Sequence, residues 1–397
     1  MSLNTTPTAN RLHIGIFGRR NSGKSTLINT ITRQAVSIVS DIAGTTTDPV
    51  YKPMEIKPFG PCMLIDTAGF DDTNDIGDLR ISKTEDILLK TDIAIILFTK
   101  SPDFSYEEAW IEKFKRNKIP FAAVINKADT DINTSVISRE INAVFSITPI
   151  IISAKNDTGT DKIFEEILRL LPADFEVPSI TSYLIEKNDI VVLVMPQDKS
   201  APKGRLILPQ VQTIRDLLNN KCIAITCIPE NFQNAIDNLK EPPKLIIVDS
   251  QVFKKIYEMK PKESKITSFS VLFANYKGDS KEFYKSAKKI DELKECDTVL
   301  IAEACTHAPQ TEDIGRVKLP ALLRKKVGQN LKIEIVSGHS FPKDLEKYSL
   351  IIHCGGCMFN RKYVLSRINS AKSQGIPITN YGMAIAKLTD IIDYITL

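Results

Sequence analysis

Two short clusters near the end of the sequence contain residues that bind metals. Cys305 and His307 form the first cluster, and His353, Cys354 and Cys357 form the second. Thiolate and imidazole are the ligands that zinc and iron–sulfur sites use. The clusters therefore predict a metal or iron–sulfur site, whose cysteine ligands would be Cys305, Cys354 and Cys357.

The ligand count leaves the metal open. Three cysteines fit a 4Fe–4S cluster with one non-cysteine position, and they also fit a structural zinc site of three cysteines and one histidine. Iron–sulfur is favoured because the spacing from Cys305 to His307 is tighter than in common zinc sites, and because an α/β domain of this size does not need zinc to fold. His307, His353 and Glu312 remain alternatives for the fourth ligand. Uncoordinated buried thiols are the remaining alternative for the whole set.

A phosphate-binding motif lies at the other end of the chain. The apolar segment 12–17 leads into Gly18-Arg19-Arg20-Asn21-Ser22-Gly23-Lys24-Ser25, which has the spacing of a P-loop. Backbone N–H groups of such a loop point at phosphate oxygens, the lysine reaches the β- and γ-phosphates, and the serine hydroxyl binds Mg²⁺. The expected nucleotide-binding residues here are Gly18, Asn21, Ser22, Gly23, Lys24, Ser25 and Thr26.

Two further segments complete the catalytic side of a nucleotide switch. Asp66 and Gly69 follow the apolar strand 62–65, where the aspartate can hold Mg²⁺ through water and the glycine N–H can sense the γ-phosphate. Thr45 or Thr46, in the sequence Gly-Thr-Thr-Thr-Asp, should close over Mg²⁺, with Thr46 as the expected ligand. The expected catalytic residues are Lys24, Thr45, Thr46, Asp66 and Gly69.

The base-binding side specifies guanine. Asn126, Lys127 and Asp129 follow one apolar strand, and the run Ser153-Ala154-Lys155 follows the next. The Asp129 carboxylate can accept hydrogen bonds from guanine N1–H and N2–H₂, a pattern that adenine does not offer. The backbone of the second run can meet guanine O6. These motifs predict GTP rather than ATP as the nucleotide.

These five elements in this order resemble a translation-factor-type small GTPase. The forms around Asn21 and around Thr45 are most similar to the branch of tRNA-modifying and ribosome-assembly GTPases. That resemblance implies that Asn21 helps to bind K⁺ beside the phosphates. Phe70 stands where Ras-like switches place the glutamine that orients the attacking water. Intrinsic GTP hydrolysis is therefore expected to be slow, as suits a switch.

Apolar segments alternate with helical patterns along the whole chain, which predicts an α/β fold. We expect a P-loop GTPase fold over 8–174, a small α/β domain for dimerisation over 179–263, and a C-terminal α/β domain with a mostly parallel sheet over 264–397. Within the second domain, strands are expected at 189–195, 206–208, 222–228 and 244–248, with helices at 210–219 and 230–239. In the third, strands at 298–302, 331–336 and 349–352 would bring both metal-ligand clusters to one sheet edge.

Composition sets the class of protein. The chain has 397 residues, of which 43% are hydrophobic and 25% charged, and its net charge is +4. This charge is too small for its length to suggest nucleic acid as the main partner. No apolar segment is long enough to span a bilayer, and the polar N-terminus lacks the apolar core of a signal peptide. We expect a cytoplasmic protein with no membrane partner, in which clustered cysteines bind metal more readily than they form disulfides.

The two ends together resemble the GTPase scaffold family that matures iron–iron hydrogenases (HydF). The resemblance rests on the GTPase motifs, the middle domain, and the pattern Cys-x-His followed by His-Cys-x-x-Cys. It implies a homodimer or higher homo-oligomer that carries a 4Fe–4S cluster, accepts a diiron precursor assembled with radical maturation enzymes, and delivers it to apo iron–iron hydrogenase. GTP hydrolysis would then modulate partner exchange. The alternatives are a ribosome- or tRNA-assembly GTPase with a structural zinc site, and a redox sensor that sets the GTPase rate.

Overall fold

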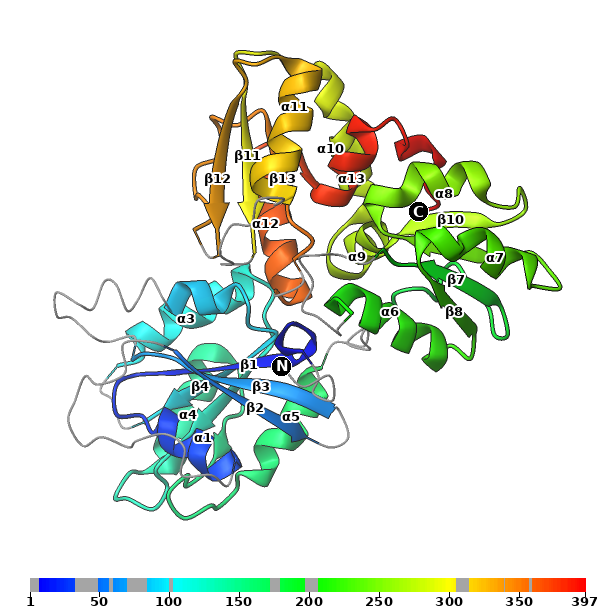
Figure 1. Cartoon of the computed structure of the whole chain (residues 1–397). Helices are drawn as coiled ribbons and strands as arrows, with labels where there is room; N and C mark the ends of the chain where they lie inside the picture. Colours follow the sequence, from blue (N-terminus) through cyan, green and yellow to red (C-terminus); the bar gives the residue numbers. More distant parts are fainter. Residues whose placement is uncertain are drawn as a thin grey trace. The chain divides into compact units, whose positions relative to one another are not determined.

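The computed structural model of the chain describes residues 7–32, 49–56, 60–69, 84–99, 103–171, 179–196, 206–304, 314–338, 340–356 and 359–397. The chain divides into two compact units, Met1–Glu176 and Val177–Leu397. Figure 1 colours the elements of both units in chain order.

The first unit has a six-stranded sheet in the order β2-β3-β1-β4-β5-β6 within its described residues. Strand β2 is antiparallel to β3, and every other neighbouring pair is parallel. Its elements are β1 (Leu12–Gly18), α1 (Lys24–Thr32), β2 (Val50–Ile56), β3 (Gly60–Asp66), β4 (Ile93–Phe98), α3 (Ser105–Arg116), β5 (Phe121–Ile125), α4 (Thr134–Phe145), β6 (Ile150–Ile151) and α5 (Asp161–Leu170).

Helices cover both faces of this sheet (Figure 1). Helices α3 and α4 bury apolar side chains such as Trp110 and Ile141 against one face. Helices α1 and α5 bury Leu27 and Ile163 against the other. The central strands are therefore mostly apolar, as is typical of parallel strands buried on both faces. This arrangement brings the carboxyl ends of the parallel strands to one edge, where ligands of such sheets bind.

The second unit begins with a four-stranded parallel sheet in the order β10-β9-β7-β8. Helices α6 and α9 pack side chains such as Leu217 and Leu272 into the core of this sheet. Its elements are β7 (Ile190–Val194), α6 (Leu208–Asn219), β8 (Ile223–Cys227), α7 (Phe232–Asp237), β9 (Leu245–Val248), α8 (Phe253–Met259), β10 (Lys265–Ser268) and α9 (Phe269–Lys277).

The strand expected over 206–208 is wrong. Leu206 and Ile207 belong to no strand, and helix α6 already begins at Leu208. Pro209 lies in the first turn of that helix. Proline has no N–H to give to a strand ladder, but it fits the first turn of a helix, where the N–H groups have no intrahelical partner.

A second four-stranded parallel sheet follows, in the order β12-β11-β13-β14. Helices α11 and α13 contribute Leu319, Leu323 and Ala384 to its core. Its elements are α10 (Ser280–Ala287), β11 (Thr298–Glu303), α11 (Leu319–Val327), β12 (Lys332–Ser337), β13 (Leu350–His353), α12 (Arg361–Ser373), β14 (Ile378–Asn380) and α13 (Tyr381–Leu388). The chain is thus α/β throughout, with a P-loop GTPase fold followed by two parallel-sheet regions.

Strand β10 belongs to the first of the two parallel sheets. Strand β10, which the expected boundary at residue 264 assigned to the C-terminal domain, is hydrogen-bonded to β9. The lysine-rich segment before it contains helix α8, which buries Phe253 and Ile256 and exposes Lys254 and Lys255. We therefore propose that the division between the two domains follows α9.

None of the helices in the described part of the chain has both the length and the apolar character needed to span a bilayer.

Candidate functional site

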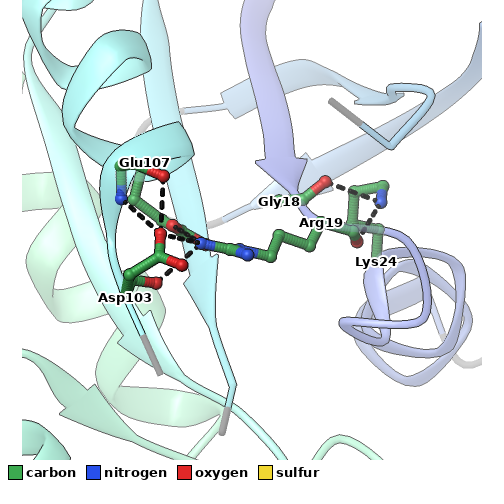
Figure 2. Close-up of polar contacts among 6 residues, drawn as sticks. Gly18, Arg19, Lys24, Asp103 and Glu107 are labelled. Carbon is green, nitrogen blue, oxygen red and sulfur yellow. Dashed lines mark hydrogen bonds and ion pairs between the residues drawn. The ribbon is translucent and has the colours of Figure 1, made fainter. Parts of the chain in front are cut away.

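The P-loop lies between β1 and α1, at the carboxyl edge of the first sheet. Lys24 is buried, and its Nζ donates to the carbonyl oxygens of Gly18 at 3.0 Å and of Arg19 at 2.9 Å. Figure 2 shows the lysine folded back over these two carbonyls. Lys24 is also the first residue of α1, so the helix N-terminus points its backbone N–H groups into the same loop. A cation and a helix N-terminus together form a phosphate-binding site.

Two glycines keep this loop open. Gly23 has φ +91°, and a Cβ atom at that position would collide with Nδ2 of Asn126. Gly69 lies against the P-loop backbone, because its Cβ would stand 2.8 Å from the backbone nitrogen of Arg20. Both glycines are therefore required by close approach of neighbouring groups.

Asp66 and Ser25, the residues expected beside Mg²⁺, lie next to each other. Ser25 Oγ donates to Asp66 Oδ2 at 2.6 Å. Asp66 is buried, and its Oδ1 has no hydrogen-bond partner among the described residues. Burial raises the pKa of this carboxyl, against the opposing effects of the Ser25 hydrogen bond and of the Lys24 charge. An unsatisfied buried carboxylate oxygen beside a hydroxyl fits a hydrated Mg²⁺, which takes oxygen ligands.

The guanine motifs meet at the ends of β5 and β6. Asn126 is buried; its Nδ2 donates to Ser22 O at 2.8 Å and its Oδ1 accepts from Ala154 N at 3.0 Å. Ser153 Oγ donates to Asp129 Oδ1 at 2.6 Å, and this hydrogen bond lowers the pKa of the exposed Asp129 carboxyl. Asp129 is therefore an ionised, solvent-facing acceptor, as guanine recognition requires.

Of the other expected nucleotide-site residues, some are described by the structure and some are not. Asn21 is exposed with φ +58°, Thr26 lies half-buried in the first turn of α1, Lys127 is half-buried with φ +66°, and Lys155 is exposed. Thr45, Thr46 and Phe70 lie outside the described residues.

Most of the expected iron–sulfur ligands lie outside the described residues. They are Cys305, His307, Glu312 and Cys357, and the neighbouring His339 lies outside them as well. Within the described part of the chain, no three His, Cys, Asp or Glu side chains gather in a way that could hold a metal ion.

Cys354 is the expected cysteine ligand that lies within the described residues. It follows β13, and its N–H donates to Ala302 O at 2.9 Å at the end of the neighbouring strand β11. Its Sγ lies 2.9 Å from the N–H of Ala304, the residue before Cys305. An N–H donor stabilises the thiolate over the thiol. Hydrogen bonds to cysteine sulfur also tune iron–sulfur clusters. Cys354, as a single expected ligand, thus has a sulfur environment that suits a cluster-bound thiolate.

His353 already has a partner on each ring nitrogen. Nε2 lies 3.0 Å from Nη1 of Arg367, and Nδ1 lies 2.6 Å from Cys354 O. A guanidinium can only donate, so Nε2 accepts and Nδ1 carries the proton. Burial, and then the Arg367 charge, lower the pKa of His353 to about 3. A role as a cluster ligand would require one of these contacts to break.

Sequence reasoning missed the roles of two arginines near these sites. Arg367, in α12, is buried and also donates to Gly338 O at 2.6 Å. Arg19, in the P-loop, pairs with Glu107 of α3. Neither is a defining residue of a motif, so local spacing gave no signal for either. Burial raises the pKa values of Cys222, just before β8, and of Cys227, at its end.

Family models match most of the chain. The hydrogen maturase F dimerization domain matches residues 180–278 and the hydrogen maturase F tetramerization domain matches residues 281–396. The 50S ribosome-binding GTPase model matches residues 13–127.

Individual relatives match the GTPase end. The tRNA modification GTPase MnmE of Endomicrobium trichonymphae is 35% identical over 217 residues, or 51% of this chain and 46% of that protein. MnmE of Prochlorococcus marinus (strain NATL2A) is 33% identical over 159 residues, or 40% of this chain and 34% of that protein. The chain thus spans less than half the length of these relatives. A variant of Aquifex aeolicus Era bound to GDP.AlF4- aligns over 54% of this chain and 92% of Era, with 19% identity and a TM-score of 0.37.

Proposed function

The chain belongs to the HydF hydrogenase maturase GTPase family, and from that premise we propose that it carries a 4Fe–4S cluster and delivers a diiron precursor to apo iron–iron hydrogenase. It is a GTP-hydrolysing enzyme that binds GTP and Mg²⁺, and its dimerization and tetramerization domains make it a homo-oligomer. The radical maturation enzymes would supply the precursor. The proposal therefore has two parts, binding of a 4Fe–4S cluster and delivery of the diiron precursor.

The hydrogen bond from Ala304 N–H to Cys354 Sγ carries this proposal. It holds the sulfur of one expected ligand against the residue that precedes a second, Cys305. Cys305, Cys354 and Cys357 would hold the cluster, which would provide the anchoring point for the diiron precursor. His307 and Glu312 are the candidates for the fourth ligand. His353 would orient the loop instead, because both of its ring nitrogens have partners.

Anaerobic reconstitution with iron and sulfide tests the cluster. The wild type should bind about four iron atoms per chain and show the visible absorption of a 4Fe–4S cluster. Cys354→Ala should lose the iron, the absorption and the ability to activate apo-hydrogenase. Cys222→Ala is the matched control, because Cys222 is a buried thiol of the other parallel sheet whose Sγ lies 3.1 Å from Glu186 O. GTP hydrolysis measured in parallel reports whether the first unit is folded. Full iron content in Cys354→Ala, or zinc in place of iron in the wild type, would contradict the proposal.

We also propose that Asn21 binds K⁺ beside the phosphates. The supporting observation is its exposed position in the P-loop at φ +58°. The positive charge of K⁺ would partly compensate for the absence of a glutamine after Gly69. Thr45 or Thr46 would close over Mg²⁺. Slow GTP hydrolysis would then let GTP binding modulate partner exchange. Hydrolysis should be faster in K⁺ than in Na⁺ for the wild type, and equal in the two salts for Asn21→Ala. Equal wild-type rates in the two salts would exclude K⁺ activation.

A further inference from the structure

Arg19 ties the P-loop to helix α3. Its Nε donates to Glu107 Oε1 and its Nη2 to Glu107 Oε2, both at 2.8 Å. Nη2 also donates to the carbonyl oxygen of Asp103 at 2.7 Å, and the guanidinium lies 4.9 Å from the ring centre of Tyr106. Figure 2 shows the side chain extended from the loop toward these acceptors. The contact is a two-pronged arginine–carboxylate pair, the geometry that fixes both partners in orientation.

Because Glu107 is buried, loss of its arginine partner would be costly. Its side chain is only 2% exposed, and that of Arg19 is 16% exposed. A carboxylate is rarely buried unless its partners satisfy it, because desolvation is costly. The guanidinium occupies both Glu107 oxygens, and the hydrogen bonds with Glu107 are the first cause of the raised pKa of Arg19. Glu107 lies in the first turn of α3, within a helix that packs Trp110 and Phe114 into the sheet core. The helix thus provides a rigid anchor for the arginine.

The anchored residue also orients the catalytic lysine. Lys24 Nζ donates to the carbonyl oxygen of Arg19 at 2.9 Å, so one residue is held by α3 through its side chain and holds Lys24 through its backbone (Figure 2). We infer that Glu107 is a positioning residue for GTP binding and hydrolysis, because it fixes the Arg19 carbonyl that directs the Lys24 ammonium toward the phosphates. This inference concerns the GTPase reaction and does not depend on the iron–sulfur cluster.

The pair also connects the nucleotide site to a second surface of the first unit. Tyr106, beside Glu107, is 39% exposed, and Asp103 is exposed ahead of the same helix. A displacement of the start of α3 would therefore move the Arg19 side chain and, through it, the cradle of Lys24.

Glu107→Gln tests the inference with Glu112→Gln as its matched control. Glu112 lies on the same helix, is 62% exposed, and pairs with Lys115 instead of the P-loop. The expected result for Glu107→Gln is a fall in kcat of about tenfold to a hundredfold, as misplacement of a catalytic group produces, together with weaker GDP binding. Glu112→Gln should match the wild type, because exposed ion pairs contribute little. Wild-type kcat and GDP affinity in folded Glu107→Gln would overturn the inference.

A double-mutant cycle separates positioning from general destabilisation. GDP dissociation constants are measured for the wild type, Glu107→Gln, Lys24→Ala and the double variant. If Glu107 acts through Lys24, its substitution should have almost no further effect once Lys24 is absent. Additive effects would overturn the inference, because they would show that Glu107 acts independently of the lysine. If Glu107→Gln does not fold, Arg19→Lys, which keeps the charge but loses the two-pronged geometry, is measured in the same cycle.

Discussion

At the scale of single residues, Asn126 joins the two halves of the nucleotide site. Its side-chain amide donates to the P-loop carbonyl of Ser22 and accepts from the backbone of Ala154 in the second guanine motif. Both atoms are buried, so each hydrogen bond is made away from competing water. The expected phosphate and base subsites are therefore joined by one hydrogen-bonded side chain, and a side chain placed in this contact should disturb both.

Gly23→Ala should abolish this contact. Its Cβ would collide with Asn126 Nδ2, and φ +91° is unfavourable for alanine. Isothermal titration calorimetry should show GDP binding weakened by at least about tenfold, which corresponds to the loss of one hydrogen bond to a buried group. Gly60→Ala is the control: Gly60 has φ +85° with no atom within 4 Å of the added Cβ. It should cost about 1 kcal/mol of stability and leave GDP affinity unchanged. Unchanged GDP affinity in Gly23→Ala would show that the loop can adjust.

The thiols should differ sharply in reactivity. Burial raises the pKa of Cys62 to about 12, whereas Cys296 is exposed. Alkylation requires the thiolate, so at mildly alkaline pH Cys296 should react with iodoacetamide and Cys62 should react only after denaturation. Peptide mapping by mass spectrometry measures both sites in one sample. Modification of Cys62 in the folded protein at the rate of Cys296 would mean that β3 opens readily.

Sequence alone could predict residues that act through contiguous motifs and could not predict residues that act through distant pairing. Lys24, Asp66 and Asn126 each belong to a short pattern whose chemistry is local. Arg19 and Glu107 are 88 positions apart, and only folding brings them together. Arg367 was missed for the same reason, since its contact with His353 depends on how α12 packs over the end of β13.

At the scale of elements, strands that are buried on both faces were predictable because they form continuous apolar segments. Strand β7 lies within the expected range 189–195, whereas β11 and β13 each end one residue beyond their expected ranges. Strand β14 was not predicted because it has only three residues, of which Thr379 is polar. The buried Thr379 hydroxyl donates a hydrogen bond to Phe283 O. The prediction of a strand over 206–208 was wrong because hydrophobic periodicity cannot distinguish a strand from the start of a helix over only three residues.

The helix-capping asparagines of the two units should each affect the unfolding of their own unit. Asn133 Oδ1 accepts from Val136 N at the start of α4, and Asn360 Oδ1 accepts from Tyr363 N at the start of α12. Replacing either asparagine by alanine should cost about 1 kcal/mol. Asn133→Ala should lower only the stability of the first unit, and Asn360→Ala only that of the second. Hydrogen exchange followed by mass spectrometry assigns the loss to a unit, and each variant serves as the control for the other. A loss shared equally between the units would mean that they unfold together.

At the scale of the whole molecule, the two parallel sheets of the second unit are tied together. The N–H of Thr396 donates to Ile266 O and its carbonyl accepts from Thr267 Oγ1, so the end of the chain adds to the edge of β10. Arg361 Nη1 donates to the carbonyls of Tyr276 and Gly278, which end helix α9. These bonds cross the division between the two sheets. We therefore expect the sheet that carries Cys354 and the sheet that contains β10 to unfold together. The first unit, Met1–Glu176, is a separate compact body.

Guanine nucleotide should therefore stabilise only part of the chain. GDP with Mg²⁺ should contact residues of the first unit, and a ligand stabilises the unit that binds it by about 2.7 kcal/mol at a hundredfold excess over Kd. Calorimetry should show two transitions, of which the one from the first unit moves to higher temperature with GDP while the other stays fixed. Asp129→Asn, which alters the guanine acceptor, is the control and should reduce that shift. A nucleotide-dependent rise in both transitions would instead reveal direct energetic coupling between the GTP site and the unit that contains Cys354, the coupling that a nucleotide-gated scaffold needs at some stage of its cycle.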